Sequence, residues 1–167
     1  MVDMGEVLTN RDQVPDVFIE VFDYWNRSRG DAAVARWGSF RLEDLPPKIL
    51  PWSIVVDVEP GAVEFRFRFW GTKRTSLIGV ELTGALTSAI PHAEMREGNV
   101  REYQEVFRIG KPMLFDTPIV KGSGINTAFQ SLRLPLTDDG ESISKIYSAL
   151  NYEKVLAEHY KFFGTDR

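Results

Sequence analysis

The stretch that most constrains the fold is FRFRFW, residues 65–70, in which phenylalanine and arginine alternate. Successive side chains of a β-strand point to opposite faces, so this alternation predicts a strand with two unlike faces. One face receives the three phenylalanines, and the other receives Arg66, Arg68 and Trp70. We expect the phenylalanine face in the core and the second face in solvent. If the second face were internal, Arg68 would need an anion or a carboxylate to offset its desolvation.

The rest of the chain predicts an α+β domain. Turn residues and periodicity predict five strands, at 52–59, 63–70, 112–120, 126–137 and 142–152. Helical spacing predicts an N-terminal amphipathic helix over 14–30, a helical turn near 42–45, short helices at 73–78 and 86–89, a longer helix at 94–109 and a C-terminal helix over 153–167. We therefore expect one antiparallel sheet of five strands with helices on one face. Residues 1–13 are expected to be mobile, and residues 31–152 are expected to form the domain.

Composition excludes several classes of protein. The net charge of −4 argues against a nucleic-acid partner, which usually selects a basic surface. The chain has no cysteine, which excludes disulfides, thiolate metal sites and a cysteinyl–flavin adduct. No run of about 18 apolar residues predicts a membrane span, and the N-terminus lacks the pattern of a signal peptide. We therefore expect a cytoplasmic location.

Four motifs occur in an order that resembles one protein family. They are YWNRSRG, LEDLPPKILPWSIVVDVE, FRFRFWGTKRTSLIGVELTG and LRLPLTDDGESISKI. Together they resemble a family of small bacterial PAS-like proteins, mostly standalone, over about residues 22–152; the segment RWGSFRLEDL departs from the family pattern. The resemblance implies a PAS fold with strand 52–59 between strands 63–70 and 142–152. It also implies a sensory or interaction module that commonly holds a small ligand between sheet and helices and commonly dimerises.

The sequence offers a candidate ligand pocket but also a bland alternative. A pocket on the core side of the sheet would be lined by apolar walls and one amide, from Phe67, Phe69, Tyr103, Phe107, Leu114, Gln130 and Leu132. Ordinary filled cores have the same composition. A ligand-binding sensor and a pure interaction module therefore both remain open. An enzyme is the third reading, which we do not expect, because Ser123 in GSG lacks the GxSxG spacing of a nucleophile elbow.

No cofactor or metal is indicated by these residues. His92 is a conceivable haem ligand, but a lone histidine in a polar stretch is usually exposed, and His92 and His159 are too far apart in the sequence to suggest a zinc site. We expect neither haem nor flavin, and the identity of any ligand is left open. The carboxylates of the long helix are expected on its exposed side: Glu94, Glu97, Glu102 and Glu105.

Both terminal helices carry apolar stripes that need a covering surface. The first stripe is formed by Phe18, Val21, Phe22 and Trp25, and the second by Leu156, Tyr160 and Phe163. We predict a homodimer built mainly on the first stripe. The alternative is a monomer in which the N-terminal helix folds back on its own sheet. A downstream protein partner is also expected, but the sequence does not identify it.

Overall fold

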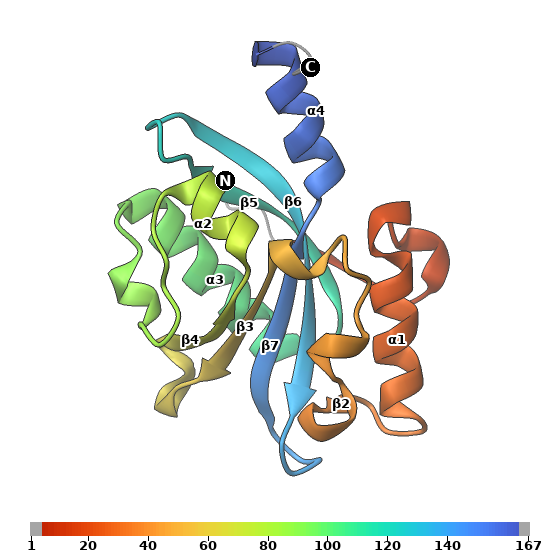
Figure 1. Ribbon diagram of the computed structural model, residues 1–167. Helices are drawn as coiled ribbons and strands as arrows, with labels where there is room; N and C mark the ends of the chain where they lie inside the picture. The colour runs from red at the N-terminus through yellow and green to blue at the C-terminus, as the bar shows by residue number, and fades with distance from the viewer. Residues whose placement is uncertain (1–4, 164–167) are drawn as a thin grey trace.

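The computed structural model describes residues 5–163, and its centre is an antiparallel sheet. The five long strands are β3 (Ser53–Val58), β4 (Phe65–Trp70), β5 (Met113–Val120), β6 (Asn126–Thr137) and β7 (Ile143–Leu150). They lie side by side in the order β5-β6-β7-β3-β4 (Figure 1). β3 lies between β4 and β7, as the family resemblance implied.

Two strands of two residues each enlarge the sheet to seven. β1 (Glu6–Val7) pairs antiparallel with β5, and β2 (Ala35–Arg36) pairs parallel with β6. Neither strand was predicted from the sequence, because two residues are too few to show the alternation of a strand. The predicted mobility of residues 1–13 is wrong over its later part, because residues 5–13 form β1 and the capped turn η1 (Arg11–Gln13), and Leu8 is buried. Residues 1–4 lie outside the described part.

Helices cover both faces of the sheet, not one as predicted. One face carries α2 (Thr72–Ile78), η7 (Thr87–Ala89) and α3 (Ala93–Ile109). The other carries α1 (Ile19–Arg29) and the short turns η2 (Asp16–Phe18), η3 (Trp37–Ser39), η4 (Leu42–Asp44) and η5 (Leu50–Trp52). Figure 1 shows α1 on the opposite side of the strands from α2 and α3. The sheet therefore separates two apolar cores.

The C-terminal helix α4 (Tyr152–Phe163) projects from the end of the sheet (Figure 1). Val155 is buried at its base. The predicted contributions of His159, Tyr160 and Phe163 concern side chains outside the described part, as do residues 164–167. In residues 5–163 no helix combines the length and apolar character needed to cross a membrane.

A β-bulge explains where the alternation of residues 65–70 breaks. Phe67 pairs with Val56 and Phe69 pairs with Val55, so Arg68 is an extra residue in β4. An extra residue reverses the faces of the side chains that follow it. Phe69 therefore packs with the α1 core, and Trp70 is buried beside Phe67 in the α3 core. The expectation that Trp70 is exposed is wrong for this reason.

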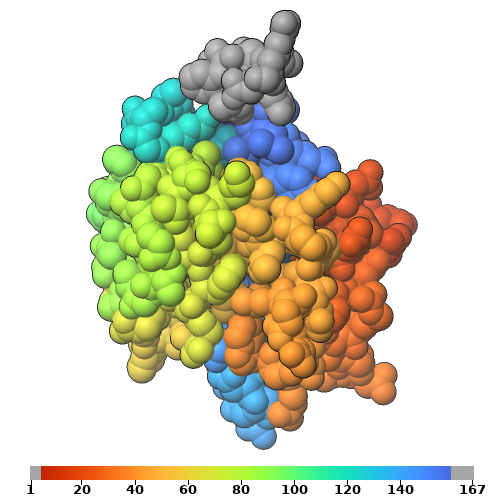
Figure 2. Space-filling view, in the orientation of Figure 1, coloured from red at the N-terminus to blue at the C-terminus, as the bar shows by residue number. Residues whose placement is uncertain are grey.

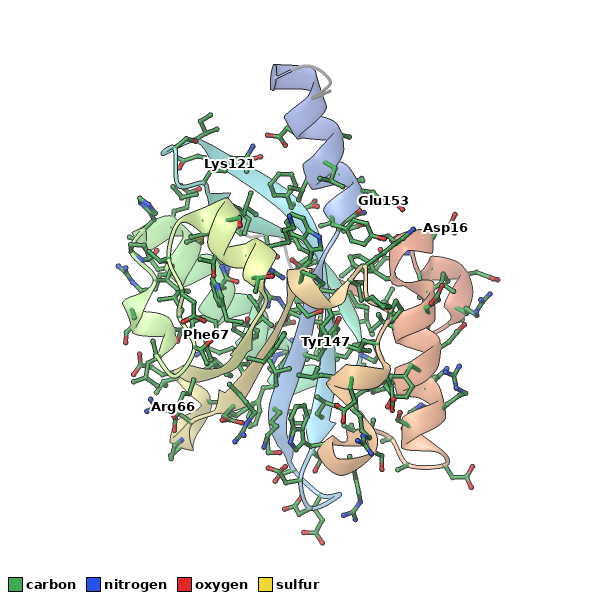
Figure 3. All side chains as sticks on the ribbon, viewed as in Figure 1. Asp16, Arg66, Phe67, Lys121, Tyr147 and Glu153 are labelled. Carbon is green, nitrogen blue, oxygen red and sulfur yellow. The ribbon has the colours of Figure 1, made fainter. Side chains whose placement is uncertain are left out.

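The arginines of β4 do face solvent, as predicted. Arg66 Nε donates to Glu59 Oε1 at 2.7 Å, and Arg68 Nε donates to Asp57 Oδ1 at 2.9 Å. Both side chains are about half exposed, so these ion pairs contribute little to stability. In Figure 3 Arg66 lies at the rim of the molecule, whereas Phe67 lies inside the layer formed by α2 and α3.

Close backbone packing holds α3 against β5. A Cβ atom at Gly98 would lie 2.7 Å from Pro118 Cγ, well inside van der Waals contact. Glycine therefore lets the two backbones approach more closely than any other residue would. Asn99, Glu102 and Val106 follow on the same buried side of α3.

Candidate functional site

The seven residues predicted to line a pocket do not surround one cavity. Phe67 and Tyr103 are buried in the α3 core. Phe69, Leu114 and Leu132 pack instead in the α1 core, on the other side of the sheet. The leucine side of β6 does lie in a core, as predicted, but that core is covered by α1 and includes Tyr147, labelled in Figure 3.

The other two predicted lining residues lie nearer the surface. Phe107 is 38% exposed, although the preceding residue of α3, Val106, is buried. Gln130 is half-buried, and its Oε1 accepts a hydrogen bond from Asn151 Nδ2 at 3.0 Å. The predicted anion contact, Arg68, pairs with Asp57 on the surface. The proposed lining is thus divided among two cores and the surface.

The stripe predicted to form a dimer interface is buried within the chain itself. Phe18, Val21, Phe22 and Trp25 all lie in the α1 core. Trp25 Nε1 also donates a buried hydrogen bond to Pro135 O of β6 at 2.8 Å. The structure therefore shows the alternative arrangement, with the N-terminal helix folded on its own sheet, and these residues are corrected from interface to core.

Sequence analysis missed a buried arginine in the α3 core. Arg133 on β6 is 2% exposed, and its Nε and Nη2 donate to Glu102 Oε1 at 3.1 and 3.0 Å. Nη2 also donates to Asn99 Oδ1 at 2.9 Å, and Nη1 donates to Ser148 Oγ at 2.8 Å. Its guanidinium carbon lies 4.2 Å from the centre of the Tyr103 ring, a cation–π distance. Glu102 and these polar groups offset the cost of burying the cation.

Glu102 was expected on the exposed side of α3, and that expectation is wrong. Its side chain is buried beneath the helix, where Oε1 accepts from Arg133 and from Thr117 Oγ1, the latter at 2.6 Å. Thr117 in turn lies 2.7 Å from Ser131 Oγ. These hydroxyls come from β5 and β6, so the buried ion pair ties α3 to these two neighbouring strands.

A second buried arginine, Arg74, belongs to the same core. It is 3% exposed, and its Nε donates to Trp52 O at 2.8 Å. Burial, together with the neighbouring positive charge of Arg133, lowers the pKa of Arg74 to about 10. Gly71 determines this placement: a Cβ there would lie 2.2 Å from Pro51 O, so only glycine lets α2 begin against the start of β3.

A small cavity lies between the sheet and helices α2 and α3. Its volume is about 10 Å³, enough for one water-sized group. Arg74 and Asn99 are its two polar lining residues, and the rest are apolar: Ile54, Phe67, Trp70, Ile78, Ile90, Met95 and Ile119. Figure 2 shows the yellow-green and green segment that carries α2 and α3 covering this side of the molecule.

Larger hollows lie at the surface. One groove of about 330 Å³ runs beside α1 and is lined in part by Phe22, Trp25, Arg29 and Lys111. None of the charged residues that line this groove is buried. The small internal cavity, by contrast, is lined by the buried Arg74 and by Asn99, which accepts a hydrogen bond from the buried Arg133. We therefore take the internal cavity as the candidate site. Arg133, Arg74 and Asn99 are the residues that the sequence did not indicate.

Histidine and carboxylate chemistry is not part of this site. His92 is exposed at the start of α3 and does not line the cavity. Among the side chains of residues 5–158, which are the ones that the structure describes, no group of three histidines, aspartates or glutamates is placed to hold a metal ion.

A family model described as a PAS domain matches residues 15–151. The chain belongs to the PAS domain family. The match spans all five long strands and α1, α2 and α3. Membership confirms the resemblance seen in the sequence and supports a sensory or regulatory role. The internal cavity lies in the layer between the sheet of this PAS domain and its helices.

Three solved structures are similar to this PAS domain. An RNA-binding light-oxygen-voltage receptor is 12% identical, with a TM-score of 0.43, and the match covers 97% of this chain but 44% of that one. A fungal LOV domain photoreceptor is 14% identical, with a TM-score of 0.48, and the match covers 81% of this chain and 90% of that one. A sensory box histidine kinase/response regulator from Burkholderia thailandensis is 10% identical, with a TM-score of 0.39, and the match covers 67% of this chain and 87% of that one. No curated protein matches the sequence.

Proposed function

We propose that this PAS domain is a non-catalytic sensor that binds a small molecule in the core between its sheet and helices α2 and α3. The observation that carries the proposal is the meeting of Arg74 and Asn99 on one apolar cavity. A few polar groups within apolar walls are typical of small-molecule sites. A core selected for stability alone would not be expected to bury the Arg74 cation without a carboxylate beside it.

Native mass spectrometry of protein purified from its own host tests this function. We expect a native mass that exceeds the denatured mass of 19.0 kDa by that of one small molecule. An absorbance scan of the same sample decides whether haem or flavin is that molecule. Identical native and denatured masses, together with no thermal stabilisation by any member of a metabolite panel, would contradict ligand binding.

A pure interaction module is the second candidate function. It is favoured by the small volume of the cavity, about 10 Å³, which leaves the core nearly filled. Under this reading Arg133, Glu102 and Asn99 serve only to hold α3 on the sheet. The mass measurement separates the two functions, since a filled core retains no ligand.

We further propose that the domain signals by contact with another protein chain, and that it forms a homodimer. The support lies in α4, which projects from the domain and presents Leu156 at 42% exposure. Lys121 Nζ donates to Glu158 Oε1 at 3.0 Å, which ties α4 to the end of β5. Light scattering at micromolar concentration tests the dimer: a particle of 19.0 kDa would overturn it.

A further inference from the structure

Arg74 differs from the other buried cations in the part of the chain that the structure describes. Three cationic side chains are buried there: Arg74, Arg133 and Lys145. Arg133 pairs with Glu102, and Lys145 Nζ lies 2.9 Å from an oxygen of Asp138. No carboxylate of residues 5–163 lies within 4.0 Å of Arg74, whose hydrogen bond to a carbonyl oxygen uses one of its five N–H donors.

The charge of this core is therefore unbalanced. Arg74 and Arg133 contribute two positive charges, and Glu102 contributes one negative charge. With a pKa of about 10, Arg74 stays protonated at neutral pH although burial opposes its charge. An anion beside Arg74 would offset that cost, since opposite charges attract more strongly where water is excluded.

Tyr103 Oη is a second buried polar group of the same core that is weakly satisfied. It has no hydrogen bond of ordinary geometry to any described residue. Buried hydroxyls are almost always hydrogen-bonded in folded proteins, so a weakly satisfied one calls for an explanation. The guanidinium carbon of Arg133 lies 4.2 Å from the centre of the Tyr103 ring, and a hydrogen bond with Tyr103 is among the causes that raise the pKa of Arg133, so the Tyr103 hydroxyl has at most this one loose partner.

We propose that Arg74 and Asn99 bind the head group of a small monocarboxylate, and this assignment rests on the ligand-binding function proposed above. The planar guanidinium presents parallel N–H donors that match the two oxygens of a carboxylate. The apolar lining fits a short hydrocarbon tail. The excess of a single positive charge disfavours a dianion, whose second charge would be buried without a partner.

The cavity also limits the size of the ligand. About 10 Å³ accommodates one water-sized group, so even acetate requires a lining side chain to move. Met95 is suited to this movement, because methionine has three rotatable bonds and adapts to irregular spaces. Short acids such as acetate and propionate should therefore bind, while long-chain acids should be excluded.

The test uses thermal unfolding of the full chain with sodium acetate as the probe, at ionic strength held constant with sodium sulfate. We expect acetate to raise the melting temperature in proportion to the logarithm of its concentration above the dissociation constant, by roughly 5–10 °C at one hundred times that constant. Arg74→Met should weaken acetate binding at least tenfold. The matched control is Arg101→Met, which removes an exposed arginine from α3 and should leave the response unchanged.

A second measurement keeps the test decisive if Arg74→Met fails to fold. In ¹⁵N NMR spectra of the wild-type protein, acetate should shift the backbone signals of Arg74, Met95 and Asn99 with the same dissociation constant as the thermal response. Shifts confined to surface residues, or an equal acetate response in Arg74→Met, overturn the assignment. A neutral molecule retained in the core, with no acetate response, would also overturn it while leaving the ligand-binding function intact.

Discussion

Replacing Glu102 with glutamine should strongly destabilise the fold, because it leaves Arg133 as an uncompensated buried cation. Glutamine keeps the shape of the side chain and an oxygen that can accept from Thr117 Oγ1. It removes only the negative charge that receives two hydrogen bonds from Arg133, at 3.1 and 3.0 Å. The substitution therefore measures the electrostatic part of the interaction rather than a loss of packing.

The expected loss is large compared with the stability of a domain of this size. Removing one partner of a buried ion pair costs about 3–5 kcal/mol, and a whole domain is stable by about 5–15 kcal/mol. For a chain of this length each kcal/mol lowers the melting temperature by about 2–4 °C, which predicts a drop of roughly 6–20 °C. The pair qualifies for this estimate because both side chains are almost fully buried, at 2% and 6% exposure.

A double-mutant cycle in urea is the appropriate assay. Glu102→Leu and Arg133→Met should each be strongly destabilising alone, whereas the double variant should be more stable than either single one, since apolar residues can replace a buried pair at little cost. The variant Glu105→Gln changes a carboxylate one turn along α3 that pairs on the surface with Arg108, and it should cost less than about 1 kcal/mol. Additive effects of the two single substitutions, within about 0.5 kcal/mol, would refute the reasoning.

Three further predictions follow from other contacts. Phe22→Ala should lower the free energy of unfolding by about 3–5 kcal/mol in urea, since Phe22 lies in the α1 core; unchanged stability with a change only in oligomeric mass would contradict this placement. Gly71→Ala should cost about 1–3 kcal/mol, because its Cβ would meet Pro51 O at 2.2 Å, and an unchanged urea midpoint would show that α2 can move aside. Hydrogen bonds from the backbone N–H groups of residues 142 and 141 lower the pKa of Asp139 from 3.8 to about 2. Because the folded pKa is the lower one, the stabilisation by Asp139 is present above pH 4 and lost towards pH 2, so melting curves of wild type and Asp139→Ala should converge over that range.

The pattern of residues predicted the strands and helices well because each long element carries a clear period. β6 occupies the predicted residues 126–137, and Gly30 and Gly110 end α1 and α3 with positive φ angles. The bulge at Arg68 was not predictable, since an extra residue in a strand is visible only against its pairing partner.

The site was missed for a different reason. Arg133 lies on the side of β6 opposite its leucines, which would be exposed if helices covered only one face of the sheet. The apolar stripe of α1 contained the missing information: a helix that covers the second face makes both sides of β6 internal. Under that arrangement a cation in the middle of LRLPL requires a buried carboxylate, which directs attention to Glu102.

The close packing of Gly98 against Pro118 limits how this PAS domain can respond to a ligand. With 2.7 Å between a Cβ at Gly98 and Pro118 Cγ, sliding α3 along β5 would force its next side chains into the proline ring. One turn later Glu102 forms a buried ion pair with Arg133, so we expect α3 to stay fixed on its side of the cavity. The opposite wall, α2, has seven residues and is joined to the sheet through Gly71. An expansion of the core beyond what the Met95 side chain can accommodate would therefore be expected to displace α2 rather than α3.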